Sequence, residues 1–411
     1  MNRNQIFTTL ELIDGQIRLT VGEFFNSNFY IYDVFTSSSK GLAGEQIVDE
    51  KEVIDTLNSL LALARRKIEI DINSVSLCLP SYSITISERT ATSPVNGKNS
   101  LITQTDIDNA IRIAYKSRVE EGQEIIEVIP IDFTVDNDET HNFVPLGYRS
   151  STFKIRYNLL TLPKELINTY KRIIKACNLK VEYQFLDTIC LYEGAFSEDD
   201  LDIAVLDLSR FTTRLNIYRK GRLLKYISLG EGIESIIKEV ATTYNMELAQ
   251  ARELVLVNGN ARSELASDYS IYKSEINGRV SYLSERELSK IIEAKLNALL
   301  EQVLSETNNL LFKDKFEVVI CGYGSEIKNL DAKFYQLAKV ETSVAKSNVL
   351  GITKANNIQT YGLIKLTYNN LGQKGYKNLQ IENENDIITN EGNKEKEFSN
   401  FDTLTLNEDD L

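Results

Sequence analysis

The stretch VLDLSRFTTRLNIY, residues 205–218, contains the residue types from which proteins build a phosphate site. Asp207 ends an apolar run, and Thr212 and Thr213 follow after a tight turn. Some proteins hold a phosphate in such a turn, where backbone N–H groups point at the phosphate oxygens. These turns normally carry glycines, because a side chain would keep the phosphate away from the backbone. The turn of this chain instead consists of Ser209, Arg210 and Phe211.

The residues alone leave two interpretations of this stretch open. Asp207 is either an ordinary strand-end carboxylate that caps a turn or part of a phosphate site. Arg210 and Arg214 are either solvated surface side chains, the interpretation that we favour, or cations that bind an anion.

The composition argues against several function classes. The chain has 411 residues, enough for two to four domains, and its 42% hydrophobic and 26% charged residues are typical of a soluble globular protein. Its net charge of −13 argues against binding to nucleic acid or to anionic lipid. The single histidine, His141, lies in a polar stretch, so histidine-based catalysis and zinc sites are nearly excluded.

Cysteine use and hydropathy predict a cytoplasmic protein. The N-terminal residues MNRNQIFTTLEL contain no long apolar region of a signal peptide. No run approaches the ~18 apolar residues of a membrane span. The cysteines are scattered without CxxC spacing, which predicts buried free thiols in a reducing compartment. They are Cys78, Cys177, Cys190 and Cys321.

Hydrophobic spacing predicts the strands and helices that must position these residues. Alternating apolar runs on both sides of Asp14-Gly15 predict a hairpin. Capping-box spacing predicts one helix start at Thr105, with Asp108, and another at Ser284. Buried strands are expected within residues 74–80, 124–136, 149–163, 203–206 and 316–321, and helices within residues 52–67, 103–119, 164–178, 233–244, 247–256 and 284–311.

The order of these elements predicts two lobes with a cleft between them. A strand pair, then helices, then a strand occurs twice along the chain, as in a duplicated α/β protein. A separate unit, from about residue 82 to 150, interrupts the first lobe. After about residue 370 the sequence is polar and acidic, and we expect a disordered tail.

One segment resembles a known family specifically. Residues 124–161, EIIEVIPIDFTVDNDETHNFVPLGYRSSTFKIRYNLLT, are similar to the subdomain that FtsA carries in place of the corresponding actin subdomain. Residues 178–196 and 284–303 also resemble FtsA, so the resemblance spans roughly residues 5–370. FtsA is the bacterial cell-division member of the actin/Hsp70/sugar-kinase superfamily. The resemblance implies an α/β, actin-like (ribonuclease H-like, duplicated) two-lobed fold with an FtsA-type inserted subdomain.

The resemblance also implies the domain boundaries. The first lobe would comprise residues 1–81 and 151–198, interrupted by the inserted subdomain at residues 82–150. The second lobe would span residues 199–370, with a helical subdomain at about 232–310. Residues 371–411 would form the acidic tail.

By this resemblance, three loops would contact ATP and magnesium. The second phosphate loop of the family usually reads Asp-Ile-Gly-Gly-Gly-Thr-Thr-Asp. Asp207, Thr212 and Thr213 match it, and Asp207 would contact the metal through water. The glycines and the closing Asp do not match: Phe211 is bulky where a phosphate would lie, while Arg210 could offer charge to an anion. The other candidate contacts are Glu11, Asp14 and Gln16 in the first loop and Gly322, Gly324 and Ser325 in the adenosine turn.

The departures from the family pattern predict weak or lost ATP binding and no efficient hydrolysis. Ile13 and Asp14 replace the usual Gly and the Ser or Thr of the first loop. Arg252 and Val255 stand where the family has a ribose-contacting Glu and a base-contacting Lys. The glycines of the adenosine turn are equally compatible with a nucleotide contact and with a turn that needs positive φ.

The resemblance implies FtsZ as a partner and self-association into filaments. FtsA holds the acidic, apolar C-terminal peptide of FtsZ on the subdomain that corresponds to helix 284–310. Lys295 matches a basic residue of the family there and Arg286 is the weaker candidate, although the residues alone favour solvated side chains at both positions. The implied location is the division site, on the cytoplasmic face of the membrane. The chain ends FSNFDTLTLNEDDL, with acids where FtsA has a basic amphipathic helix, so we expect indirect membrane association.

Three functions follow from these patterns. We favour an FtsA-like division scaffold. A polymerising ATPase is the second, and the missing glycines argue against it. The third is a PilM-like subunit of a pilus or secretion platform, which shares the rhythm TTxLNIYRxGxLxxxIxLG at residues 212–230 but matches residues 125–150 less well.

Overall fold

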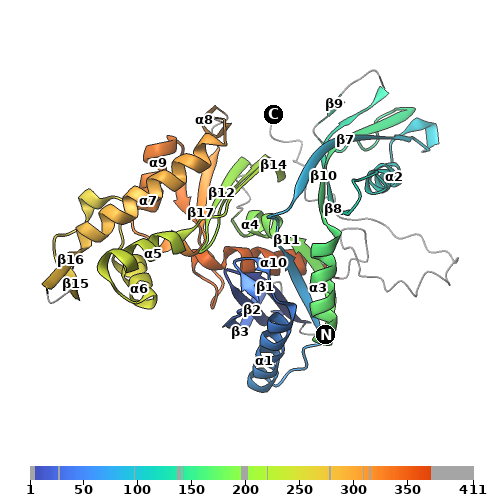
Figure 1. Cartoon of the computed structure of the whole chain (residues 1–411). Helices are drawn as coiled ribbons and strands as arrows, with labels where there is room; N and C mark the ends of the chain where they lie inside the picture. Colours follow the sequence, from blue (N-terminus) through green and yellow to red (C-terminus); the bar gives the residue numbers. More distant parts are fainter. Residues whose placement is uncertain are drawn as a thin grey trace. The chain divides into compact units, whose positions relative to one another are not determined.

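The structure is a computed structural model of the chain. It describes residues 5–25, 28–96, 98–136, 140–141, 143–195, 202–219, 221–276, 279–308, 310–313 and 316–371. These residues form two compact units, residues 5–80 with 176–371 and residues 81–175. Figure 1 shows the elements of both units in the colours of the sequence.

Lobe 1 of the first unit is built on a five-stranded sheet. Its strands are β1 (Gln5–Ile13), β2 (Gln16–Phe25), β3 (Asn28–Ser38), β6 (Ser74–Leu79) and β11 (Lys180–Leu186). They lie in the order β11-β6-β1-β2-β3, with β6 parallel to β1 and β11. β1 and β2 form the predicted hairpin, and its turn residues Asp14 and Gly15 have φ values of +56° and +72°, as a tight hairpin turn requires. A smaller hairpin joins β4 (Leu42–Ala43) to β5 (Gln46–Ile47).

Three helices belong to lobe 1. α1 (Glu50–Ile68) begins at Asp49, whose carboxylate accepts from the N–H groups of Lys51 and Glu52. α4 (Asp187–Ala195) and α10 (Ile358–Asn369) pack closely together, and α10 follows the short helix η5 (Ala355–Asn357). A Cβ atom on Gly362 would lie 1.8 Å from the carbonyl oxygen of Cys190, so this crossing requires glycine.

Lobe 2 repeats the sheet pattern of lobe 1. Its strands are β12 (Asp202–Leu208), β13 (Thr213–Arg219), β14 (Arg222–Leu229), β17 (Glu317–Cys321) and β18 (Thr342–Val344). They lie in the order β14-β13-β12-β17-β18, with β12 antiparallel to β13 and parallel to β17. Both sheets therefore combine a three-stranded antiparallel meander with two parallel strands, as expected of a duplicated protein (Figure 1).

The helices of lobe 2 surround an extensive apolar core. They are α5 (Ile233–Tyr244), α6 (Leu248–Asn258), α7 (Glu285–Ser305), α8 (Leu310–Lys313) and α9 (Leu330–Ala338), with short helices η3 (Ser263–Leu265) and η4 (Tyr323–Glu326). α7 begins with the predicted capping box, in which the Glu287 N–H donates to Ser284 Oγ and the Ser284 N–H donates to Glu287 Oε2. Before it lies a hairpin of β15 (Ser270–Ile276) and β16 (Arg279–Ser284).

The second unit is a four-stranded antiparallel sheet with two helices. Its elements are β7 (Thr85–Pro94), η1 (Lys98–Ser100), α2 (Gln104–Tyr115), β8 (Gln123–Thr134), β9 (Thr140–His141), β10 (Thr152–Pro163) and α3 (Lys164–Ala176). The strand order is β7-β10-β8-β9. Because β10 pairs with β7 and β8 along its length, residues 151–175 group with this unit, whereas the sequence analysis placed them in lobe 1.

Two local predictions in this unit are wrong. The capping box of α2 consists of Thr103 and Asp106 and not of Thr105 and Asp108, because the extended residue is Thr103 and the helix starts directly after it. His141 does not lie in an open polar loop. It is buried at the end of β9, with its ring against two aromatic rings.

The cysteines match the prediction, since all four are buried and free. In the part of the chain that the structure describes, no helix is both long enough and apolar enough to cross a membrane. The acidic tail beyond residue 371 lies outside the described residues.

Candidate functional site

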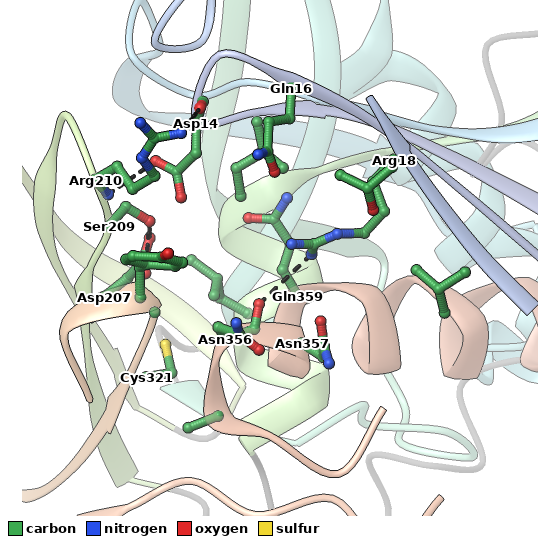
Figure 2. Close-up of a pocket in the computed structure, with 17 residues that line it drawn as sticks. Asp14, Gln16, Arg18, Asp207, Ser209, Arg210, Cys321, Asn356, Asn357 and Gln359 are labelled. Atoms are coloured by element: carbon green, nitrogen blue, oxygen red, sulfur yellow. Dashed lines mark hydrogen bonds between the residues drawn. The ribbon is translucent and has the colours of Figure 1, made fainter. Parts of the chain in front are cut away.

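Five of the ten candidate nucleotide residues line a cavity of about 240 Å³ in the first unit. It lies where the turn after β1 faces the turn after β12, next to the end of β17 and the start of α10 (Figure 2). Asp14 and Gln16 come from the first turn and β2, and Asp207 and Arg210 come from the second turn. The other lining residues are Ile13, Arg18, Val34, Thr36, Leu191, Ser209, Cys321, Gly322, Tyr323, Ala355, Asn356, Asn357 and Gln359.

Glu11 does not line the cavity, because it is buried behind it. Its carboxylate accepts from Gln359 Nε2 at 3.1 Å and from the Thr360 hydroxyl at 2.5 Å, both on α10. Arg18 lies 4.0 Å away and donates to the same hydroxyl at 3.1 Å. Glu11 therefore ties β1 to α10, and its hydrogen bonds go to protein groups.

Thr212 and Thr213 also lie outside the cavity lining. The Thr213 hydroxyl donates to the carbonyl oxygen of Glu231 at 2.8 Å. The buried Thr212 hydroxyl has no hydrogen-bond partner among the described residues.

The glycines of the adenosine turn are required by the turn itself. Gly322 has a φ of +84°, and a Cβ atom there would lie 2.2 Å from Asp207 Oδ1. A Cβ atom on Gly324 would lie 2.5 Å from the Leu208 side chain. Ser325, which does not line the cavity, donates its hydroxyl to the carbonyl oxygen of Gly322 at 2.6 Å. Close packing alone accounts for both glycines.

The two phosphate-loop turns are bonded directly to each other. The backbone N–H of Arg210 donates to Asp14 Oδ1 at 2.9 Å, and Arg210 Nη1 donates to the carbonyl oxygen of Asp14 at 3.2 Å (Figure 2). Burial, and then the Asp207 carboxylate, raise the pKa of Asp14 to about 6. The Arg210 N–H, which could otherwise donate to a phosphate, is therefore already bonded to Asp14.

Phe211 fills the space beside the first turn. Its side chain faces Gly15 and Gly44, where added Cβ atoms would lie 3.5 Å and 3.3 Å from atoms of Phe211. Both glycines have positive φ, so a larger residue at either would be strained as well as crowded. The guanidinium carbon of Arg210 lies 5.0 Å from the centre of the Phe211 ring.

A chain of ion pairs extends from this turn to the positions predicted for ribose and base contacts. Glu234 Oε2 lies 3.2 Å from Arg210 Nη2, and Glu234 Oε1 lies 3.0 Å from Arg252 Nη2. Val255 is fully buried in the core of lobe 2. Arg210 and Arg252 therefore share the Glu234 carboxylate.

Arg214, in the position of the family's closing Asp, is the centre of a buried charge cluster. Its side chain is fully buried, pairs with Asp187 and Asp207, and lies 2.9 Å from Glu45 Oε1. Its Nη2 also donates to Gln359 Oε1 at 3.4 Å. The expectation that Arg214 is solvated is wrong, because β13 is an inner strand of the sheet and its residues are covered on both faces. Arg210 precedes this strand, and its side chain is only 15% exposed because it bonds to Glu234 and Asp14.

One guanidinium faces three carboxylates in this cluster, so it cannot neutralise all of them. Burial raises the pKa of Glu45 to about 8; the Arg214 guanidinium opposes the shift, and Asp187 and Asp207 add to it. Glu45 therefore retains a proton near neutral pH. This leaves Arg214 shared by the two aspartates.

Glu45 and Asp187 were not predicted from the sequence. Asp187 directly follows the buried strand β11, the same strand-end placement that singled out Asp207, and this signal could have found it. Glu45 lies in the tight turn between β4 and β5, and nothing in the surrounding stretch GLAGEQI distinguishes it from an exposed turn residue.

These residues do not fit magnesium and a nucleotide. Pockets for drug-sized ligands measure about 300–1,000 Å³, more than this cavity offers. A guanidinium occupies the centre of the carboxylate cluster, and within the described ranges no group of three His, Cys, Asp or Glu side chains could hold a metal ion. Cys321 offers no nucleophile, because burial and then Asp207 raise the pKa of its thiol well above the ordinary value. The arrangement suits structural bonding better than catalysis.

The two candidate partner residues on α7 lie apart. Arg286 lines a second cavity of about 400 Å³, with Asp268, Ser270, Tyr282, Ser284, Glu287 and Lys290. Its Nε lies 3.1 Å from Asp268 Oδ1, and its Nη2 donates to the carbonyl oxygen of Ala266. Lys295 does not line this cavity and lies 3.6 Å from Glu239 of α5.

Family and sequence comparisons agree with the architecture. Residues 82–161 match the family model described as the SHS2 domain inserted in FtsA. The chain is 25% identical over 310 residues to cell division protein FtsA of Streptococcus pneumoniae serotype 2 (strain D39 / NCTC 7466), covering 74% of this chain and 67% of that protein. It is 23% identical over 384 residues to cell division protein FtsA of Bacillus subtilis (strain 168), covering 92% and 87%. The FtsA of Escherichia coli (strain K12) is 21% identical over 359 residues, covering 84% and 85%.

Solved structures show the same fold. The PilM-PilN type IV pilus biogenesis complex matches with a TM-score of 0.59 and 12% identity over 88% of this chain and 98% of that chain. MreB5 of Spiroplasma citri bound to ADP matches with a TM-score of 0.52 and 14% identity over 90% of this chain and 99% of that chain. These likenesses establish an actin-like two-lobed α/β fold. With an FtsA-type insert and FtsA relatives along most of its length, the chain is similar to the FtsA cell-division proteins.

Proposed function

We propose that this protein is a division scaffold that binds the C-terminal peptide of FtsZ, self-associates and organises FtsZ at the septum, on the inner face of the membrane. The observation that carries this proposal is the FtsA-type inserted unit, which is the part of the chain that distinguishes FtsA from other actin-like proteins. Arg214 in the carboxylate cluster supports a scaffold with weak or lost ATP binding over an ATPase.

An acidic, apolar peptide needs a cation at the rim of its site and an apolar surface beside it. The cavity at the start of α7 offers both, since Arg286 and Lys290 line it together with the half-exposed ring of Tyr282. Lys295 lies further along α7, in an exposed ion pair with Glu239. Arg286 is therefore a candidate contact in the cavity, and Lys295 is a candidate contact only if the peptide extends along the helix.

Binding of a labelled FtsZ C-terminal peptide, measured by fluorescence anisotropy, tests this placement. Arg286→Glu should weaken binding by about fivefold or more at low ionic strength, equivalent to ~1 kcal/mol, and by less at high salt, because a rim charge acts mainly through long-range attraction. Lys295→Glu should show the same salt-dependent loss only if the peptide reaches that turn.

A matched control is Arg172→Glu on α3, which makes the same charge change at an exposed ion pair with Glu165. It should bind the peptide like the parent protein. If both α7 variants also bind like the parent at low salt, the peptide site is not on this helix. If the parent shows no binding at all, FtsZ is not the partner.

A PilM-like role is the second candidate, and the observation in its favour is the TM-score of 0.59 to the PilM-PilN complex. At 12% identity that likeness shows the fold alone. A PilN-type peptide tested in the same anisotropy experiment separates the two roles, since only a pilus platform subunit should bind it more tightly than the FtsZ peptide.

A further inference from the structure

Side chains from the turn after β12 and from β13 make direct contacts with lobe 1. Tyr218 packs against Tyr192 of α4. The other contacts come from Arg210 and Phe211 in the turn and from Arg214 at the start of β13. The backbone and guanidinium of Arg210 donate to Asp14, at 2.9 Å and 3.2 Å. Arg214 reaches Glu45 at 2.9 Å and also pairs with Asp187 at the start of α4.

The middle residue adds a steric contact to these polar ones. Phe211 lies against the two lobe-1 glycines, Gly15 and Gly44, whose positive φ values and missing side chains leave room for the ring. The backbone of this lobe-1 surface is also fixed locally, because the Gly15 N–H donates to the carbonyl oxygen of Gly44 at 2.8 Å. The ring therefore packs on a preformed surface.

We propose that Arg210, Phe211 and Arg214 form a latch that holds the two lobes together without a nucleotide. A phosphate bound between two such turns would join the lobes through its oxygens. Here Asp14 accepts a hydrogen bond from the Arg210 N–H of the opposite turn. The guanidinium of Arg214 supplies the positive charge among the carboxylates. The proposal rests on the weak or lost ATP binding proposed above, and it concerns what replaces the nucleotide.

The charge pattern of the cluster supports a bridging role for Arg214. Its carboxylate partners come from both lobes, Asp207 from lobe 2 and Asp187 and Glu45 from lobe 1. Separation of the lobes would leave the buried Asp187 carboxylate without its cation, which is strongly unfavourable. An ion pair shared across the lobe boundary therefore favours the closed arrangement.

Distances between spin labels on the two lobes test the latch. Asn58→Cys on α1 and Glu301→Cys on α7 provide exposed labelling sites, and the four native cysteines are buried. The unliganded parent should give one narrow distance distribution that is unchanged by Mg-ATP. Arg210→Ala/Phe211→Ala should shift or broaden it, because the steric contact and the guanidinium bonds are lost. Arg214 is left in place, since its removal would uncover buried carboxylates.

Asp14→Ala provides a second variant that retains both arginines. Removing the acceptor should speed hydrogen exchange of the Arg210 backbone amide by about tenfold or more, which corresponds to ~1.4 kcal/mol. The matched control for Arg210→Ala/Phe211→Ala is Arg262→Ala/Phe312→Ala, which removes an arginine and an exposed phenylalanine of lobe 2 outside the latch.

The control should reproduce the parent distance distribution. The latch is refuted if the Arg210→Ala/Phe211→Ala distribution also matches the parent, or if the parent distribution is broad and narrows only with Mg-ATP. Because neither measurement involves FtsZ, a failure of peptide binding leaves this test intact. Calorimetry with Mg-ATP tests the proposed loss of ATP binding separately. Tight binding would contradict that proposal, whereas no binding together with an unchanged variant distribution would contradict the latch alone.

Discussion

At the scale of single residues, Arg214 decides the character of the site. The family pattern has an aspartate at this position, so the exchange reverses the charge at the centre of three carboxylates. Its strand is an inner one, which leaves no route for the guanidinium to reach water. The carboxylates that would otherwise favour a metal ion therefore share the protein's own cation.

Glu45 gives this cluster a testable pH dependence. Its pKa is about 8 in the folded protein, above the ordinary value of 4.5, so the folded state holds a proton that the unfolded state loses. Its contribution to stability is therefore complete below about pH 4.5 and is lost as the pH rises through 8. Glu45→Gln should be as stable as the parent near pH 5 and more stable at pH 8.5, by about 1 kcal/mol or more.

Urea unfolding at pH 5, 7 and 8.5 measures this difference. Glu264→Gln, at an exposed ion pair with Arg262, serves as the control and should follow the parent at each pH. Asp14, whose pKa is raised to about 6, also lowers the stability as the pH rises, and it does so equally in the parent and in Glu45→Gln. Parallel stability curves for the parent and Glu45→Gln would show that Glu45 is ionised in the folded state.

The sequence revealed only part of this residue-level arrangement. Asp207, Arg210 and Asp14 line one cavity, and a motif in each lobe singles them out in the sequence. The bonds from Arg214 to Glu45 and Asp187 could not be derived, since they join segments from three regions of the chain. Burial of a charged residue depends on which strands flank it, and the local pattern around residue 214 does not report that.

At the scale of elements, the turn after β12 is the segment on which the prediction about ATP binding rests. We expect calorimetry with Mg-ATP to show no binding at micromolar concentrations, because the Arg210 backbone donor and the space beside Gly15 are already used by the protein. A micromolar dissociation constant would require a binding free energy of about −8 kcal/mol. The same titration without magnesium gives the baseline, and a tight isotherm that appears only with magnesium would contradict the prediction.

Most elements follow from local pattern. The hairpin at Asp14-Gly15 and the start of α7 at Ser284 were predictable, because turn and capping residues act over a few positions. The start of α2 was misplaced by two residues, since Thr105-Asp108 has the same spacing as the true box, Thr103-Asp106. Local chemistry allows both, and the backbone conformation of Thr103 selects one.

At the scale of the whole molecule, the duplicated sheets and the inserted unit were predictable because each repeats a recognisable order of strands and helices. The end of the inserted unit was less predictable from the sequence. β10 is apolar enough to read as a core strand of lobe 1, and only its pairing with β7 and β8 shows its grouping with the insert.

The tail beyond residue 371 lies outside the described residues, and its charge supports a separate prediction. Deleting residues 375–411 should leave co-sedimentation with anionic vesicles unchanged, because acidic groups are repelled by such a surface. Vesicles of neutral lipid provide the comparison. A clear loss of sedimentation with the anionic vesicles after the deletion would show that the tail contacts lipid directly.

The crossing of α4 and α10 has a consequence for how this cleft can evolve. α4 begins with Asp187 and α10 carries Gln359 in its first turn, and both side chains contact Arg214, so the separation of the two helices sets the positions of these partners. That separation is fixed at Gly362 and Gly194, where a Cβ atom would meet a carbonyl oxygen at 1.8 Å and 2.1 Å. An alanine at either glycine would therefore push α4 and α10 apart and displace the residues that line the cavity, although neither position belongs to a nucleotide motif.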